Sequence, residues 1–179
     1  GQAAIPAGLP DPAHRLEAFP LTDVQHAYWL GRSDSMTLGG VSCSSYLEMD
    51  LTDIDLPRLE NAITRLVQRH DMLRAVITPD GWQQVLPELP DCRIAVEDLS
   101  ALAADERDVW LLAIREGLSH KVLPVDQAPL FQLSATRLDA VRWRLHLKFD
   151  LLIADAFSFG ILARDLMGFY ADPLLHLPP

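Results

Sequence analysis

One stretch decides the fold, the ten residues VRWRLHLKFD at positions 141–150. Its apolar side chains take every second position, at Trp143, Leu145, Leu147 and Phe149. This period of two places apolar residues on one face of a β-strand and the intervening basic residues on the other. The run from Phe131 to Leu138 precedes this stretch, and the two together predict an antiparallel pair of strands.

The remaining elements mix strands with long helices. Residues 44–51 repeat the alternation and predict a half-buried strand. Two short strands, 73–77 and 82–86, flank Pro79-Asp80-Gly81 and predict a hairpin. Helices are expected over 22–31, 55–70, 105–120 and 156–170, the first opened by a capping box of Thr22 and Gln25. This order favours an α+β sandwich, with a mainly antiparallel sheet packed by helices, over a doubly wound sheet.

Composition limits the class of protein. The chain has 179 residues, 49% hydrophobic and 22% charged, which is typical of one globular domain or one lobe of a larger unit. Its 25 acids and 15 bases give a net charge of −10, which argues against nucleic acid or an anionic membrane as partner. No apolar run reaches the roughly 18 residues of a membrane span, so a cytoplasmic location is the default expectation. Residues 1–18 are expected to form a linker or N-terminal arm.

Two acids stand where the strongest strand ends and the last helix begins. Asp150 and Asp155 could both point into one cleft. One of them would act there as a general base or hydrogen-bond acceptor, and the other would be an anchor. Their spacing alone favours a plainer alternative, in which Asp155 caps the helix and Asp150 is a strand-end charge. A metal is not expected there, because no further ligand stands nearby in the sequence. Ser158 is not expected to be a nucleophile, because no Gly-x-Ser-x-Gly turn surrounds it.

Three basic residues also have expected roles. Arg74 opens an apolar strand, and a buried arginine there needs a carboxylate, for which Asp155 is a candidate. His70 falls in the last turn of a helix, where the helix dipole favours it and a structural role is expected. His146 alternates outward with the neighbouring basic residues and is expected on a sheet face rather than in a catalytic site.

Three segments together resemble a known family. They are FPLTDVQHAYWLGR at 19–32, RHDMLR at 69–74 and DLLIADAFS at 150–158. They are similar to motifs of the heterocyclization domains of nonribosomal peptide synthetases, which are variants of condensation domains. The third segment reads Asp-x-x-x-x-Asp where ordinary condensation domains carry His-His-x-x-x-Asp-Gly, and this is the mark of the cyclizing variant. The resemblance covers about residues 11 to 177, and the stretch 38–43 is similar to siderophore synthetases of the pyochelin and yersiniabactin type.

The resemblance implies a fold similar to chloramphenicol acetyltransferase, in which two like lobes form a V with a tunnel between them. Residues 19–179 would be the N-terminal lobe. The C-terminal lobe is absent from this sequence, and with it the Thr and Asp that the family uses in cyclodehydration. The implied reactions are condensation of a carrier-bound acyl thioester with carrier-bound Cys, Ser or Thr, and ring closure with loss of water to a thiazoline or an oxazoline.

The resemblance also implies roles for individual residues. Asp150 takes the place of the family's first histidine and Leu151 that of the second, which excludes histidine base catalysis there. Asp155 corresponds to a structural acid that is expected to pair with Arg74. Asp150 and Asp155 are therefore the predicted catalytic acids, and Arg74 and Ser158 are predicted to support the active site.

No directly bound cofactor and no metal are implied, because the family's substrates are carried on the phosphopantetheine of carrier proteins. The implied partners are the C-terminal lobe, the upstream and downstream peptidyl or aryl carrier proteins and an adjacent adenylation domain. The alternative is a non-catalytic lobe that docks a carrier protein or a neighbouring domain, because fold alone does not decide function. The intact pattern of Asp150, Asp155 and Ser158 favours the enzyme.

Overall fold

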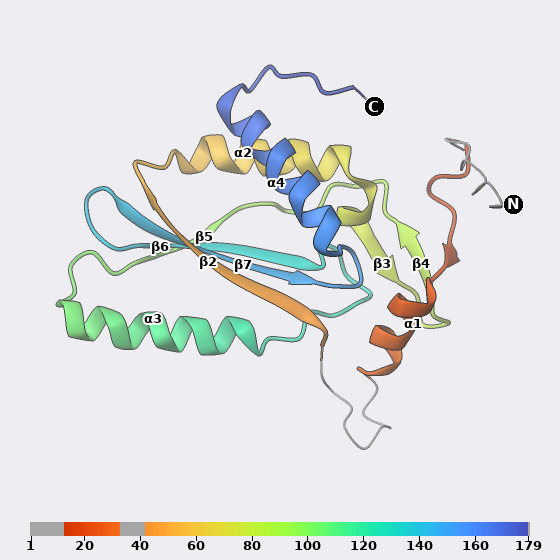
Figure 1. The fold of residues 1–179 in the computed structure, drawn as a ribbon, viewed down its shortest axis with the longest axis horizontal. Coiled ribbons are helices and arrows are strands. Elements are labelled where there is room, and N and C mark those ends of the chain that lie inside the picture. Colours follow the sequence, from red (N-terminus) through yellow and green to blue (C-terminus); the bar gives the residue numbers. More distant parts are fainter. Residues whose placement is uncertain (1–12, 33–41, 179) are drawn as a thin grey trace, which may run out of the picture.

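The computed structural model describes residues 13–32 and 42–178. Its main sheet has the strand order β2-β7-β6-β5, and a smaller sheet has the order β1-β4-β3. The strands are β1 (Phe19–Pro20), β2 (Ser44–Thr52), β3 (Ala75–Ile77), β4 (Trp82–Val85), β5 (Ala95–Asp98), β6 (Phe131–Arg137) and β7 (Arg142–Asp150). The helices are α1 (Asp23–Leu30), α2 (Leu56–Arg69), α3 (Ala104–Ser119) and α4 (Ala156–Ala171), with a 3-10 turn η1 (Asp71–Arg74) after α2. In Figure 1, α2 and α4 lie on one side of the main sheet and α3 lies on the other.

Strand β7 is the centre of the main sheet. It pairs antiparallel with β2, where Ser44 lies opposite Asp150, and with β6, where Phe131 lies opposite Phe149. Its apolar face packs against α2 and α4 in the main core, and its basic face is turned toward α3. The predicted antiparallel pair and the α+β fold class are confirmed.

Capping residues predicted from the sequence are found at the N-termini of the helices α1 and α2. In α1 the predicted capping box is formed: the Gln25 N–H donates to Thr22 Oγ1 at 3.3 Å, and the Thr22 N–H donates to Gln25 Oε1 at 3.0 Å. Asp55 caps α2 by accepting a hydrogen bond from the N–H of Arg58 at 3.0 Å. All four predicted helices are confirmed, each within one residue of its expected bounds. The buried residues of α2 follow one helical face: Leu59, Ala62, Ile63, Leu66 and Val67.

The predicted hairpin is confirmed as β3 and β4. Gly81 has a φ of 80°, a left-handed conformation that side chains with a Cβ atom rarely adopt. A Cβ atom added there would also approach the ring of Trp29 to 3.0 Å. Glycine therefore permits both the turn and the contact between the hairpin and α1.

Several features differ from the sequence-based expectation. Strand β1 was not predicted, and residues 73 and 74 of the expected hairpin belong to η1, so β3 begins at Ala75. Strand β5 pairs parallel with β6 and was not predicted, because all four of its residues are exposed and show no alternation of burial. Leu47 and Met49 of β2 are 47% and 43% exposed rather than half-buried, because β2 is the edge strand of the main sheet. The predicted arm and the stretch 38–43 lie largely outside the described residues.

Three arginines of α2 hold the segment that follows α4. Each donates to a backbone carbonyl at 2.6 Å, Arg58 to Ala171, Arg65 to Pro173 and Arg69 to Pro178. The Arg65 guanidinium also lies 4.2 Å from the centroid of the Phe169 ring. Hydrogen bonds from these arginines to backbone carbonyls therefore hold residues 171–178 against α2.

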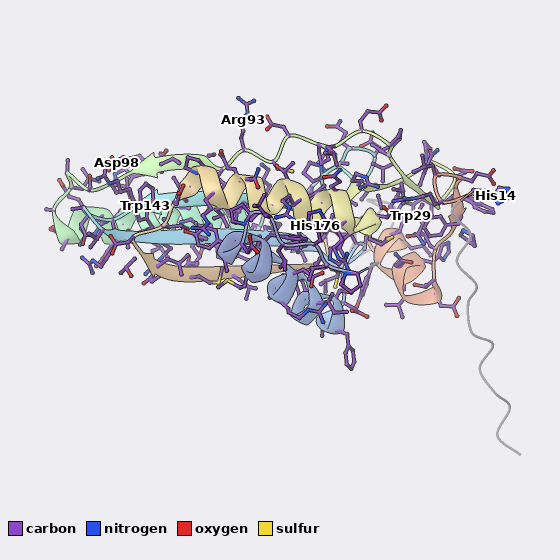
Figure 2. All side chains as sticks on the ribbon, turned by 90° about the horizontal axis from the view of Figure 1, so that it is seen from above. His14, Trp29, Arg93, Asp98, Trp143 and His176 are labelled. Carbon is purple, nitrogen blue, oxygen red and sulfur yellow. The ribbon has the colours of Figure 1, made fainter. Side chains whose placement is uncertain are left out.

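Replacing Arg65 by Met is expected to lower the free energy of unfolding by about 1–2 kcal/mol, because charged hydrogen bonds to backbone carbonyls are lost. Urea titration followed by circular dichroism measures the change. Arg93→Met is the control: this side chain points away from the protein in Figure 2 and is 83% exposed, so no measurable change is expected. Equal losses in the two variants would contradict the role assigned to Arg65.

Candidate functional site

The link between β7 and α4 forms one side of a groove of about 840 Å³. The link contributes residues 151–155 and α4 contributes Ala156, Ser158 and Phe159. Helix α1 contributes Val24, Gln25 and Tyr28. Thr22, Ser45 of β2 and Met72 complete the lining. The junction singled out in the sequence therefore faces an open groove with both apolar and polar walls.

Asp150 lies in the interior and is not among the groove-lining residues. Its side chain is 2% exposed and forms an ion pair with Arg32. Oδ2 also accepts a hydrogen bond from Ser42 Oγ at 3.0 Å, and Oδ1 accepts one from the N–H of Leu152 at 3.1 Å. Arg32, Ser42 and the N–H of Leu152 occupy both carboxylate oxygens, an arrangement typical of a structural anchor.

The partner of Asp150 was not identified from the sequence. Arg32 follows α1, is 10% exposed, and also donates to Ser42 Oγ at 2.8 Å. The sequence offered only a weak signal, an arginine that ends the first motif directly after the run AYWLG at 27–31. The pairing could not be predicted from sequence patterns, because Arg32 lies 118 residues before Asp150.

Asp155 is the N-cap of α4 and lines the groove. Its Oδ1 accepts hydrogen bonds from the N–H and the hydroxyl of Ser158, at 2.8 and 2.7 Å. These bonds lower the pKa of Asp155, so it remains a carboxylate at neutral pH. The capping role that the spacing favoured is confirmed for Asp155, and Ser158 is occupied in holding that cap.

The predicted pairing of Arg74 with Asp155 is wrong. Arg74 is buried as expected, at 5% exposure, but its Nη2 donates to Asp71 at 2.7 Å. Its Nη1 donates to the carbonyls of Val67 and Gln68, at 2.8 and 3.0 Å. Arg74 ends the turn η1, three residues after Asp71, so a carboxylate and the free carbonyls at the end of α2 lie within reach. Arg74 therefore fastens the end of α2 and does not support Asp155 directly.

His70 has the structural role expected of it, through a contact that the sequence did not indicate. It follows the last residue of α2, and its Nε2 lies 2.9 Å from Asp165 of α4. Asp165 is 1% exposed and also accepts from Arg69 Nε at 3.1 Å. The pair ties α2 to α4.

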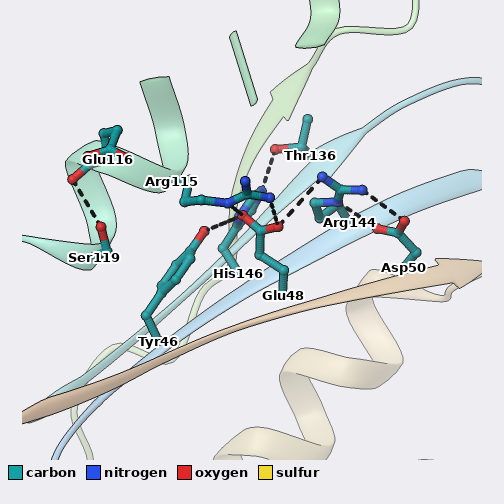
Figure 3. Close-up of polar contacts among 9 residues, drawn as sticks. All are labelled: Tyr46, Glu48, Asp50, Arg115, Glu116, Ser119, Thr136, Arg144 and His146. Carbon is teal, nitrogen blue, oxygen red and sulfur yellow. Dashed lines mark hydrogen bonds and ion pairs between the residues drawn. The ribbon is translucent and has the colours of Figure 1, made fainter. Parts of the chain in front are cut away.

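His146 lies on the sheet face as predicted, but it is buried at 1% exposure rather than facing outward. Figure 3 shows it within a hydrogen-bonded chain. The Tyr46 hydroxyl must donate to the Glu48 carboxylate, at 2.9 Å, so it accepts from His146 Nδ1, at 2.8 Å. Burial lowers the pKa of His146, which favours the neutral ring, and the proton on that ring is at Nδ1. Nε2 then accepts from the hydroxyl of Thr136 at 2.9 Å.

The other basic side chains of this face are also paired. Arg115 of α3 forms two hydrogen bonds to Glu48, at 2.9 and 2.6 Å, and these bonds lower the pKa of Glu48. Arg144 pairs with Asp50 at 2.6 Å. Lys148, also buried, donates to the carbonyl of Ser119 in α3 at 2.7 Å. Helix α3 thus supplies hydrogen-bond partners to Glu48 of β2 and to Lys148 of β7.

Two general features of the described residues bear on function. No three His, Cys, Asp or Glu side chains among residues 13–32 and 42–178 gather in a way that could hold a metal ion. In the same part of the chain no helix is long and apolar enough to cross a membrane.

Replacing Asp150 by Asn is expected to lower the free energy of unfolding by about 3–5 kcal/mol, because Arg32 would keep its charge in the interior without a carboxylate. The measurement is urea unfolding of Asp150→Asn, Arg32→Met and the double variant. A direct pair predicts that the double variant loses less than the sum of the single losses. Additive losses would show that the two residues act separately.

Acid is expected to destabilise the protein through His146. The folded pKa lies below the ordinary 6.5, so the unfolded chain takes up the proton first, and stability falls as the pH drops below about 6.5. His146→Gln should therefore flatten the dependence of melting temperature on pH between about 7.5 and 5, above the range in which Glu48 titrates. His120→Gln is the control, because His120 is 81% exposed. An unchanged slope in His146→Gln would refute the assignment.

Comparisons with known protein families and with individual proteins point to the same family. The chain matches the Condensation domain family over residues 16–176. It is 42% identical over 162 residues to phenyloxazoline synthase MbtB of Mycolicibacterium paratuberculosis, which covers 89% of this chain and 14% of that protein. It is 38% identical over 178 residues to pyochelin synthetase PchE of Pseudomonas aeruginosa PAO1, covering 99% of this chain and 12% of that protein. The chain thus spans only a small part of the relatives it matches.

Solved structures agree with this similarity. The cyclization-docking bidomain of the nonribosomal peptide synthetase EpoB from Sorangium cellulosum matches with a TM-score of 0.89 and 39% identity, over 96% of this chain and 34% of that one. The SgcC5 protein of Streptomyces globisporus matches with a TM-score of 0.70 and 26% identity, over 89% of this chain and 38% of that one. These matches confirm the expected chloramphenicol acetyltransferase-like α+β fold. Because the family match extends over residues 16–176, the chain belongs to the condensation-domain family of nonribosomal peptide synthetases and is similar to its cyclization domains.

Proposed function

We propose that residues 19–179 are the N-terminal lobe of a heterocyclization domain, preceded by a linker or arm at 1–18. In the first reaction, the amine of carrier-bound Cys, Ser or Thr attacks the acyl thioester of a second carrier. An amide forms, and the thiol of that carrier's phosphopantetheine leaves. In the second, the side-chain thiol or hydroxyl adds to the amide carbonyl and water is lost, which closes a thiazoline or an oxazoline.

The observation that carries this proposal is the chemistry of the segment 150–155. Where ordinary condensation domains place two histidines, this chain has a buried, ion-paired Asp150 and the apolar Leu151. Neither can act there as a histidine base, which supports a repurposed motif. Similarity to MbtB, a phenyloxazoline synthase, and to the cyclization domain of EpoB supports the same reaction class.

The geometry divides the two acids between different tasks. Asp155 is a carboxylate that lines the groove, so it can accept a hydrogen bond from the attacking amine. Asp150 acts indirectly, by holding the end of β7 through Arg32. Ser158 keeps Asp155 in place, and Arg74 holds the neighbouring turn. The residues that promote cyclodehydration would come from the C-terminal lobe.

The partners follow from the proposed reactions. The substrates arrive on the phosphopantetheine of upstream and downstream peptidyl or aryl carrier proteins, so no cofactor needs to bind this lobe directly. An adjacent adenylation domain would load the amino acid onto its carrier. The C-terminal lobe of the same domain would close the tunnel of which the groove forms one part.

Intact-mass spectrometry of loaded carrier proteins tests the proposal. Acyl- and cysteinyl-loaded carriers are incubated with this lobe alone and with the lobe joined to its natural continuation. Product is expected with the joined form only, lighter by one water than the simple amide. If neither form makes product while carrier proteins still bind, the chain is instead a docking lobe.

Asp155→Asn separates the cap from the proposed chemistry. Asparagine caps helices about as well as aspartate, so the melting temperature should stay near that of the parent protein. The loss of the negative charge at the groove is expected to slow product formation by about tenfold to a hundredfold in the joined form. Asp155→Ala is the matched variant, expected to lose both the cap and the activity. Full activity in Asp155→Asn would limit Asp155 to capping.

A further inference from the structure

Helix α1 contacts the link between β7 and α4 at two points. Arg32, just beyond the end of the helix, forms the ion pair with Asp150. Gln25, in the first turn, donates from Nε2 to the carbonyl of Leu152 at 2.7 Å. The two residues are seven positions apart, about two helical turns, so the first motif holds both the start and the middle of the link.

The Gln25 side-chain amide is fixed in orientation by its neighbours. The N–H of Thr22 can only donate, so the atom 3.0 Å from it must be the amide oxygen of Gln25. That places Nε2 toward the link. Gln83 of β4 completes the arrangement, because the two glutamine amides exchange hydrogen bonds of 3.0 and 3.2 Å. Gln83 is 3% exposed and also donates to the carbonyl of Pro20 at 2.9 Å.

The peptide that Gln25 holds belongs to the wall of the groove. Leu152, Ile153 and Ala154 are buried, at 1%, 6% and 5% exposure, and Leu151 and Asp155 on either side line the groove. The N–H of Leu151 donates to the Cys43 carbonyl at 3.0 Å, and the N–H of Ile153 donates to the Asp150 carbonyl at 3.2 Å. Side chains satisfy the remaining backbone groups around Leu152. Two side chains hold Leu152: Asp150 accepts from its N–H at 3.1 Å, and Gln25 donates to its carbonyl at 2.7 Å. Gln25 is therefore the side chain that fixes the Leu152 carbonyl, between the two acids.

We propose that Gln25 is a positioning residue for the condensation and cyclization reactions, acting through the Leu152 carbonyl on the wall that carries Asp155. This inference rests on the proposed function. Gln25 touches no reacting atom in this role, because its effect passes through the backbone of the link. Its loss should lower the rate of the chemical steps more than the binding of the carrier substrates.

Gln25→Glu and Gln83→Glu form a matched pair of variants in the full-length synthetase. Each breaks one half of the amide pair and replaces an NH₂ group by an oxygen. Gln25→Glu keeps the oxygen that accepts from Thr22 but loses the donor to Leu152. Gln83→Glu loses the donor to Pro20 and leaves the bond to Leu152 in place. The difference between the variants therefore isolates the contact with the link.

Gln25→Glu is expected to lower kcat for ring formation by about tenfold to a hundredfold, with KM for both loaded carriers within about twofold of the parent. Gln83→Glu is expected to lose less than about threefold in kcat, although it should lose at least as much melting temperature as Gln25→Glu, because Gln83 is the more deeply buried of the two. Hydrogen exchange across residues 150–156 should accelerate in Gln25→Glu only. Equal losses of kcat in the two variants, or a normal kcat in Gln25→Glu, would overturn the proposal.

Hydrogen exchange separates this inference from the proposed function. If the unmodified synthetase forms neither amide nor ring, the proposed function fails, and the kinetic role of Gln25 fails with it. If the synthetase forms the ring and exchange across 150–156 is the same in both variants, the proposed function stands and the positioning role of Gln25 is refuted.

Discussion

The candidate site depends on the buried ion pair between Arg32 and Asp150. Moving two charges out of water is costly, and such a pair is stable only when other groups satisfy the remaining hydrogen-bonding capacity. Ser42 and the N–H of Leu152 do so for the carboxylate here. The pair joins the end of α1 to the end of β7, two segments far apart in the chain. The groove is lined by residues of α1 and of the link that follows Asp150, so the pair joins two of the segments that form its walls.

Strand β7 packs against helices on both faces of the main sheet. Its apolar face forms the core with α2 and α4, as strict alternation predicts. Two residues of its basic face, His146 and Lys148, are also buried, and α3 supplies the carbonyl of Ser119 as a partner for Lys148. The neutral His146 on that face makes the arrangement sensitive to acid. A strand with one polar face is therefore not always exposed to solvent on that face.

The two acids of the Asp-x-x-x-x-Asp motif have different environments and so different uses. Asp150 is buried and paired, and it supports the structure behind the groove. Asp155 is exposed at the N-terminus of α4, where hydrogen bonds from Ser158 keep it ionised. At position 150, ordinary condensation domains have a histidine, which could act as a base. The aspartate found here instead forms an ion pair that stabilises the structure. In the proposed reaction this leaves the chemistry to Asp155 and to residues outside this lobe.

Local patterns in the sequence predicted the helices, the hairpin and the central strands, because caps, turn residues and periodicity act over a few neighbouring positions. The spacing of the motifs also indicated the family. The partners of the site residues could not be predicted this way: Arg74 was assigned to Asp155 but binds Asp71, and Arg32 binds Asp150 across 118 positions. Such contacts depend on how whole elements pack, and only the tertiary structure brings these groups within hydrogen-bond distance.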